Sequence, residues 1–237
     1  DRLRSRGLGD VYKRQITFIY GGRLRMEELQ IAKLPSNFKV YEIDDYHAIN
    51  CDKEAKNFLD IINEAKKEND VQRYIKSNQK WFIPLSILKA YDFGHHFSCV
   101  VPEFQLGSQY RLDYLLVGKN SLGYQFVFVE FEDVNVDFRI KTANAETEKV
   151  RKGLNQIRDW KRWIDQNRAY FFASEGIKEF ANNVPSWGFR YCLVVSRRDR
   201  MDEISNQLRG EMQSETRVTI MTYDRLVEYV ERLHNGI

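Results

Sequence analysis

The sequence predicts a mixed α/β fold in which a largely apolar sheet is flanked by helices. Three observations support this prediction: a run of period-two segments in the middle of the chain, a long amphipathic helical pattern after it, and apolar strands that then alternate with helices. Continuously apolar strands are typical of sheets that are buried on both faces. Alternation of such strands with helices indicates a layered α/β architecture.

The predicted strands begin with three β-rich segments, 99–105, 110–117 and 124–132. Turn-prone residues, LGSQ and KNSLG, separate them, which predicts a three-stranded antiparallel meander. The sequence letters FKVYEI, FRYCLVVS and RVTIMTY indicate three more strands, at 38–43, 189–196 and 217–223.

The clearest predicted helix spans 146–167, directly after the meander. Val150, Leu154, Ile157 and Ile164 recur at helical spacing on one apolar stripe, on which Lys161 also falls, and we expect this stripe to dock on the sheet. Shorter helical patterns include Phe58, Leu59, Ile61 and Ile62, the stretch from Asp70 to near Asn78, and the segments 200–210 and 224–234. From Asp70 onward the order is therefore α-β-β-β-α-β.

The chain is long enough for one large domain, or for one domain with an appendage, since it has 237 residues of which 43% are hydrophobic. Residues 1–15 have no apolar periodicity and resemble translated adapter sequence, so we set them apart as a non-native or disordered segment. A basic nucleic-acid-binding arm is the alternative for them. We expect 16–66 to form a small N-terminal portion and 67–237 to form the main domain.

Overall charge does not identify a partner. The net charge of +3 equals that of residues 1–15, and the remaining 32 basic and 32 acidic residues balance. The three cysteines have no paired spacing, which argues against a disulfide framework or a zinc site and favours a reducing, cytoplasmic setting. No apolar stretch is long enough for a membrane span, so a soluble protein is expected.

The strand at 124–132 ends in two glutamates separated by one phenylalanine. Residues two apart on a strand share a face, so Glu130 and Glu132 project together, on the side of Phe126 and Phe128. If the hairpin turns at 121–122, cross-strand partners have residue numbers that sum to 243, and Asp113 lies opposite Glu130. Cβ atoms in such pairs are about 5 Å apart.

Carboxylates that converge on a buried strand end repel one another and are costly to desolvate. A divalent cation would offset this cost. Asp113, Glu130 and the backbone carbonyl of Phe131 form a plausible oxygen ligand set for Mg²⁺. The alternative is that the strand leaves the core here, so that Glu130 and Glu132 point to solvent or pair with Arg or Lys.

The order of helix, strand with Asp, strand with acid-x-acid and helix with Gln resembles the PD-(D/E)xK nuclease superfamily, a restriction-endonuclease-like core. More closely, residues from about 70 to 200 resemble the C-terminal nuclease domain of Shedu anti-phage defence proteins. The segments that carry this resemblance are NDVQRYIKSNQKWF (69–82), VVPEFQLGSQYRLDYLLVG (100–118), FVFVEFED (126–133), GLNQIRDWKRWIDQN (153–167) and YCLVVSRR (191–198).

The resemblance implies roles for particular residues. Asp113 and Glu130 match the two motif acids that bind the metal, and Gln156 matches a helix glutamine that borders the site. Asp70 stands where the first helix often offers an additional acid, with Glu68 and Glu64 as alternatives. The implied activity is hydrolysis of DNA with Mg²⁺ or Mn²⁺ in bacterial antiviral defence.

The sequence departs from the family pattern at Glu132, where the usual residue is a lysine that orients the attacking water and steadies the developing negative charge. Glutamate cannot stabilise negative charge, but it can bind a metal or accept a proton from water. Lys149 and Lys152 on the following helix are candidates to replace the missing cation. The alternative function is a catalytically inactive module that binds nucleic acid or a protein partner.

Two groups of basic residues are candidates for contacting DNA, the expected partner. Arg158 and Arg162 alternate with Trp160 and Trp163, as in proteins that stack bases, although tryptophans on a docked helix more often serve packing. Arg197 and Arg198 follow a strand, where phosphate contacts would be well placed, with a solvated loop as the alternative. A homo-oligomer is also left open.

Overall fold

A computed structural model of the protein describes residues 31–237. The segment 1–15 and the first part of the N-terminal portion, 16–30, therefore lie outside the described residues. In the described part, no helix is long and apolar enough to cross a membrane.

In residues 31–237 the centre of the fold is a mixed sheet of six strands, whose order is β1-β2-β5-β6-β9-β10. β1, β2, β5 and β6 are antiparallel neighbours, whereas β6, β9 and β10 are parallel. The strands are β1 (Lys39–Tyr41), β2 (Phe97–Pro102), β5 (Tyr114–Asn120), β6 (Gly123–Phe131), β9 (Phe189–Val194) and β10 (Thr219–Met221). The predicted mixed α/β class and the antiparallel order of the predicted meander are confirmed, but the chain around its first predicted turn, 105–111, forms a separate small hairpin instead of the ends of β2 and β5.

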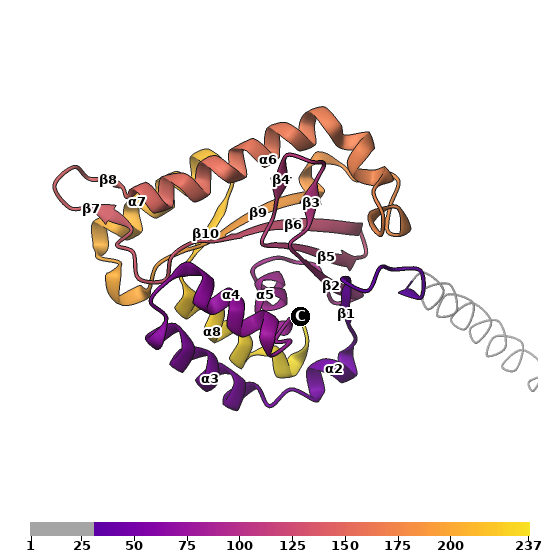
Figure 1. The fold of residues 1–237 in the computed structure, drawn as a ribbon, viewed down its shortest axis with the longest axis horizontal. Coiled ribbons are helices and arrows are strands. Elements are labelled where there is room, and N and C mark those ends of the chain that lie inside the picture. Colours follow the sequence, from indigo (N-terminus) through magenta and orange to yellow (C-terminus); the bar gives the residue numbers. More distant parts are fainter. Residues whose placement is uncertain (1–30) are drawn as a thin grey trace, which may run out of the picture.

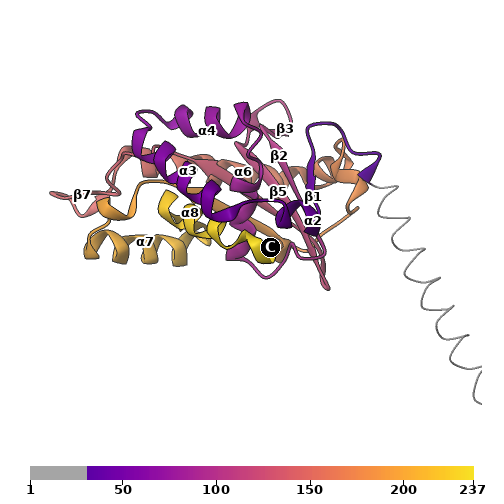
Figure 2. The same ribbon diagram turned by 90° about the horizontal axis from the view of Figure 1, so that it is seen from below.

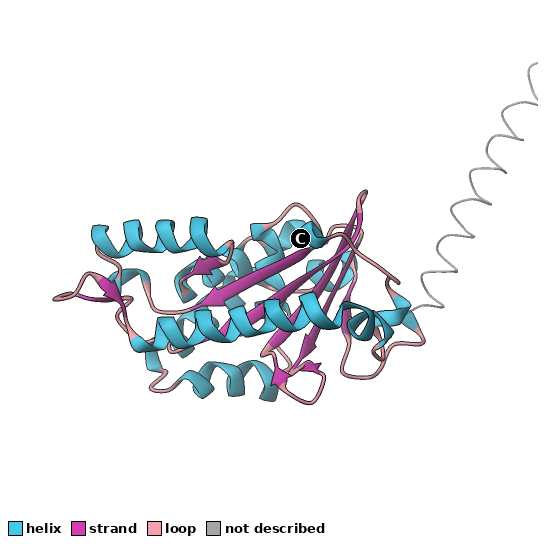
Figure 3. Ribbon diagram, turned by 90° about the horizontal axis from the view of Figure 1, so that it is seen from above, coloured by secondary structure: helices cyan, strands magenta, loops and turns pink. Residues whose placement is uncertain are grey.

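Helices cover both faces of this sheet. The long helix α6 (Glu148–Ala173) lies across one face (Figures 1 and 3), and helices that include α3 and α8 lie on the other (Figure 2). The α-helices other than α6 are α2 (Ile43–His47), α3 (Cys51–Glu64), α4 (Glu68–Ser77), α5 (Phe82–Leu85), α7 (Glu203–Thr216) and α8 (Tyr223–Glu231). The arrangement is consistent with an α/β nuclease-like core.

Short elements connect these layers. Two small hairpins are formed by β3 (Gln105–Leu106) with β4 (Tyr110–Arg111), and by β7 (Arg139–Ile140) with β8 (Ala145–Glu146), the second of which projects from the body in Figure 1. Single 3-10 turns are η1 (Ser86–Ala90), η2 (Ile177–Glu179), η3 (Ser186–Gly188), η4 (Arg198–Arg200) and η5 (Leu233–Asn235).

The two faces of β6 belong to two different hydrophobic clusters. Val127 and Val129 pack on the side of α3 and α8. Phe126 and Phe128 pack on the other side, in the cluster that contains the apolar stripe of α6. This follows from the period of two in an extended strand. It means that the side chain at any even position of β6 faces α6.

The hairpin between β5 and β6 has the predicted register. Leu115 pairs with Phe128 and Asn120 pairs with Gly123, so that two residues form the turn and partner numbers sum to 243. Gly123 has a φ of +106°, a backbone conformation that side chains rarely adopt. The glycine therefore helps to fix where the hairpin turns, and with it the register.

Some element boundaries differ from the prediction. α6 continues to Ala173 past a break in helical geometry at Asn167, the residue at which the sequence pattern predicted its end. α7 begins at Glu203 rather than at residue 200, because the Asp202 side chain accepts a hydrogen bond from the Ser205 amide at 2.8 Å and caps the helix. The N-terminal portion contributes β1 to the sheet edge and α3 to the packing against α8.

Replacing Gly176 with alanine should destabilise the protein. Gly176 has a φ of +80°, and a Cβ atom there would overlap the ring of Phe38. The left-handed conformation alone costs about 1–2 kcal/mol for an alanine, and the overlap adds to it.

Gly210→Ala is the matched control: nothing lies within 4 Å of a Cβ at this helical position, so it should stabilise α7 by about 0.5–1 kcal/mol. Urea denaturation would measure both, and a Gly176→Ala variant as stable as the wild type would contradict this account.

Candidate active site

The acidic end of β6 lies buried beneath α6. Glu130 is only 4% exposed and Glu132 is fully buried. Even numbering places both side chains on the α6 face, and Gly153 of α6 lies directly above: a Cβ at Gly153 would be 3.0 Å from the Cγ of Glu132. The interpretation that these glutamates point to solvent is therefore wrong, and the shared face is confirmed. The other half of that alternative, pairing with a lysine, holds for Glu132.

Lysines of α6 contact the deeper glutamate. The Nζ of Lys152 lies 3.1 Å from Oε1 of Glu132, and the Nζ of Lys149 lies 4.0 Å from Oε2. The side chains of Lys152 and Lys149 are 55% and 43% exposed, so each reaches from solvent into the buried end of the strand. Glu132 thus has cations at the site even though the lysine of the family motif is absent from position 132.

Asp113 stands beside this strand end. The last residue pair of the hairpin is Tyr114 with Val129, so Asp113 directly precedes β5 at the level of Glu130. Its Oδ2 accepts a hydrogen bond of 2.7 Å from the backbone N–H of Phe131. That bond holds the carboxylate against the edge of β6, where the register predicted it.

The backbone of Phe131 faces the same edge. The Glu132 amide donates to the Val194 carbonyl at 2.8 Å on the β9 side, whereas the Phe131 amide donates to Asp113 on the opposite side. Since the N–H and C=O of one strand residue point to the same neighbour, the Phe131 carbonyl is also directed to the side of Asp113. This arrangement fits the predicted use of that carbonyl.

Aromatic side chains support the strand end from the opposite face. The ring of Phe131 lies 5.1 Å from the ring of Tyr114 and 5.6 Å from that of Tyr223. The buried hydroxyl of Tyr223 donates to the Glu132 carbonyl at 2.7 Å. The backbone that carries the two glutamates is therefore fixed by packing and by a buried hydrogen bond.

Ser196 ties the loop after β6 to the end of β9. Its amide donates to the Asp133 carbonyl at 3.1 Å, and its hydroxyl donates to the Val136 carbonyl at 2.7 Å. Ser196 is buried and has a φ of +66°. A non-glycine residue in this conformation is strained, and such strain is often found at functional sites.

The available ligand atoms suit a hard divalent cation. Within residues 31–237, no group of three or more His, Cys, Asp or Glu side chains is arranged to hold a metal. The predicted set contains two carboxylates and one carbonyl, all oxygen donors, and Mg²⁺ usually keeps several waters beside so few protein ligands. The hydrogen bond from the Phe131 amide occupies one of the roughly four lone-pair positions of the Asp113 carboxylate.

Gln156 lies one turn after Lys152 on α6. Both residues line an open depression of about 490 Å³ on the α6 surface, together with Tyr110 and Asn155. The residue that the family pattern assigns to the border of the site thus shares a surface with the lysine that contacts Glu132.

Asp70 serves as a cap of α4. Its Oδ2 accepts hydrogen bonds of 3.0 Å from the amides of Lys66 and Lys67, which hold the pKa of the carboxyl below its usual range. It also pairs with Arg73 at 3.3 Å. Asp70 therefore has a local structural role, and any part in metal binding stays a prediction, as it does for Glu64, which is exposed.

A different face of α4 approaches Asp113. Gln72, Arg73 and Lys76 line a cavity of about 210 Å³ whose other wall includes Asp113 and Glu103. Their helical spacing, with Asn69 one turn earlier, is the signal by which this polar face could have been found in the sequence.

The basic residues predicted on α6 are partly engaged. Trp160 is fully buried and Trp163 is 7% exposed, so both serve packing rather than base stacking. Arg158 donates to Asn155 at 2.8 Å, and Arg162 pairs with Asp159 at 3.2 Å. A role of Arg158 or Arg162 in nucleic-acid binding stays a prediction.

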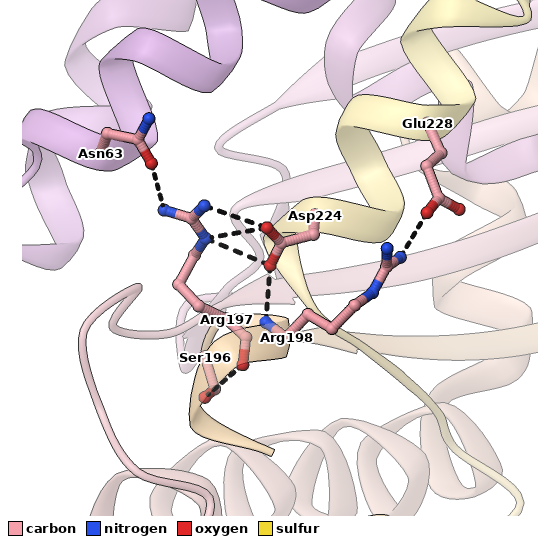
Figure 4. Close-up of polar contacts among 6 residues, drawn as sticks. All are labelled: Asn63, Ser196, Arg197, Arg198, Asp224 and Glu228. Carbon is pink, nitrogen blue, oxygen red and sulfur yellow. Dashed lines mark hydrogen bonds and ion pairs between the residues drawn. The ribbon is translucent and has the colours of Figure 1, made fainter. Parts of the chain in front are cut away.

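Arg197 and Arg198 have different environments, as Figure 4 shows. The guanidinium of Arg197 is 12% exposed, contacts Asp224 at 3.0 Å and donates to Asn63 of α3 at 2.8 Å. The guanidinium of Arg198 is 58% exposed and contacts Glu228 of α8. Arg197 therefore joins three segments of the fold, whereas Arg198 remains largely at the surface.

The contact with Arg197 affects the pKa of the Asp224 carboxyl. Burial raises its pKa, but hydrogen bonds from the Arg197 guanidinium and the Arg198 amide outweigh burial, so the pKa of Asp224 lies below its usual value. A carboxyl with a lowered pKa in the folded state contributes stability above its unfolded pKa of about 3.9. That contribution is lost as the pH falls through the folded value.

Comparison with known families agrees with the geometry. Residues 65–227 match the family model described as Shedu protein SduA, C-terminal. This range begins just before α4 and contains every residue of the strand end and of α6 described above, and it confirms the resemblance inferred from the sequence. Among curated proteins, none matches the chain significantly.

Arg197→Met should destabilise the protein by about 2–3 kcal/mol at pH 7, because it leaves the partly buried Asp224 without its main cation. The stability of this variant should also depend less on pH below about pH 4, where the wild type loses the contribution of Asp224. Arg225→Met, which removes a 46% exposed partner of Glu228, should cost less than about 1 kcal/mol. Chemical denaturation from pH 7 to pH 3 measures both effects, and equal losses for the two variants would refute the structural role of Arg197.

Proposed function

The chain belongs to the family of Shedu protein SduA C-terminal domains, which are parts of defence-system proteins, and from that premise we propose that it is a metal-dependent nuclease that hydrolyses DNA. The observation that carries the proposal is the buried pair of Glu130 and Glu132 at a strand end, with Asp113 held beside it by the Phe131 amide. Structural glutamates are seldom buried in this way unless they are paired or bind a metal.

Asp113, Glu130 and the Phe131 carbonyl would hold the metal ion. A bound Mg²⁺ or Mn²⁺ would polarise the phosphate and lower the pKa of a bound water. Glu132, the next residue on the same strand face, would orient that water or accept its proton. Gln156 would border the substrate on the α6 surface that it shares with Lys152.

Lys152 is the best candidate to supply the cation that the family motif places at position 132. Its Nζ lies 3.1 Å from Glu132, within reach of a phosphate held at the strand end. Glu132 and Lys152 would then together replace the one motif lysine. The carboxylate of Glu132 would accept the proton of the water, and the ammonium of Lys152 would stabilise the negative charge that develops on the phosphate.

Asp113→Asn and Glu130→Gln should each lower the rate of DNA cleavage by at least about 100-fold, because each removes a charged metal ligand. The measurement is nicking and degradation of plasmid DNA by the purified protein with Mg²⁺ or Mn²⁺. Asp165→Asn, on the exposed side of α6, is the matched control and should cleave at the wild-type rate. Wild-type protein that leaves DNA intact with every metal would contradict the proposal.

Lys152→Met should lower the cleavage rate more than Lys149→Met, since its Nζ is the closer to Glu132, at 3.1 Å against 4.0 Å. A loss of roughly 100- to 1000-fold is typical when a group that stabilises developing charge is removed. Lys152→Arg should retain part of the activity. Equal rates for the two methionine variants would show that Lys152 has no special part in catalysis.

A catalytically inactive nucleic-acid-binding module is the second candidate, and one observation favours it. The contact of Lys152 with Glu132 neutralises the residue that differs from the motif, as in a purely structural ion pair. In that case DNA binding would persist without cleavage, and Glu130→Gln would not change the affinity for DNA. Binding of a labelled duplex with and without Mn²⁺ distinguishes the two.

A further inference from the structure

Three arginines from different elements gather near the end of β9, and we call Arg198, Arg209 and Arg225 the arginine cluster. Arg198 comes from η4, Arg209 from α7 and Arg225 from α8. The guanidinium groups of Arg198 and Arg225 both contact one carboxylate, that of Glu228, the latter at 2.8 Å. One negative charge is thus shared by two positive ones.

Arg209 adds positive charge to this group without bringing a carboxylate. Its Nε is buried and has no hydrogen-bond partner among residues 31–237. Burial, together with the nearby charges of Arg225 and Arg198, lowers the pKa of Arg209. Like charges held together in a partly buried position cost stability, so this arginine is not explained by the stability of the fold.

The two carboxylates beside the cluster are each shared among arginines. Asp224 pairs with Arg197 (Figure 4), and Arg232 adds a further positive charge near Glu228. The guanidinium groups of Arg198 and Arg225 are 58% and 46% exposed, so they are accessible to a ligand.

The cluster is close to the candidate active site along the chain. Ser196, two residues before Arg198, donates its amide hydrogen bond of 3.1 Å to Asp133, which directly follows Glu132. The chain segment that leads into the cluster is therefore hydrogen-bonded to the loop that follows the acidic end of β6. This link is the reason to consider a polymer, which can contact both places, rather than a small isolated anion.

We propose that the arginine cluster binds the phosphodiester backbone of the nucleic acid that enters the candidate active site. Guanidinium groups offer several fixed N–H donors and match phosphate oxygens in pairs. Arginines from three elements bring several such donors together in one place, where they can contact neighbouring phosphates of a polymer. The choice of nucleic acid over an acidic protein rests on the proposed function, whereas the anion-binding character rests on the charges themselves.

The test is the affinity of the full chain for a short fluorescent DNA duplex in EDTA, where no cleavage occurs. We expect each of three variants, Arg198→Met, Arg209→Met and Arg225→Met, to lose about one phosphate contact, which makes the affinity less dependent on salt. At ~0.1 M salt this loss should weaken the affinity roughly eightfold. Lys178→Met removes an exposed charge in η2, beyond the C-terminal end of α6, and should leave the affinity unchanged.

Thermal stability provides a second readout. Arg209→Met keeps the aliphatic stem but removes the repelled charge, so its Tm should equal or exceed that of the wild type while its DNA affinity falls. A residue with a purely structural role would show the reverse, a lower Tm with unchanged affinity. That result, or wild-type affinity and salt dependence in all three variants, would overturn the proposal.

Two further outcomes separate this proposal from the proposed function. If the protein never cleaves DNA but binds it through the cluster, the nuclease function fails and the binding surface stands. If the variants bind DNA normally but lose binding of a labelled poly-glutamate peptide, the surface serves an acidic protein and the nucleic-acid proposal is overturned.

Discussion

The burial of two carboxylates at the end of one strand is the constraint on which the rest of this structure depends. Glu130 and Glu132 lie under α6 with 4% and 0% exposure, and charged groups in such positions are costly unless cations or hydrogen bonds compensate. For Glu132 this compensation comes from α6: Lys152 and Lys149 reach in from that helix. Gly153 allows α6 to approach the strand closely enough for these contacts.

The same constraint explains why the backbone near the site is so firmly held. The Phe131 amide fixes Asp113, and the Tyr223 hydroxyl fixes the Glu132 carbonyl. Ser196, in a strained conformation, joins the loop after β6 to the end of β9. Functional groups are most effective when neighbouring contacts already hold them in place, and here those contacts come from both faces of the sheet.

Positive charge in this protein has two uses that overall composition conceals. Arg197 is nearly buried and joins α3, α8 and the end of β9 through Asp224 and Asn63. Arg198, its neighbour in sequence, is exposed and shares Glu228 with Arg225. Neighbouring residues of one type can therefore serve the fold and a surface separately, because successive side chains point in different directions.

The sequence by itself determined the strands of the meander, the register of the hairpin and the common face of Glu130 and Glu132. These features depend on residue periodicity and on a two-residue turn, which are local properties. The cap that Asp70 forms on α4 is also local, since its partners lie three and four residues away. Only the tertiary structure decided that Lys152 meets Glu132 and that Arg209 joins Arg198 and Arg225. Both depend on how separate elements pack, and one sequence does not encode such contacts in any local pattern.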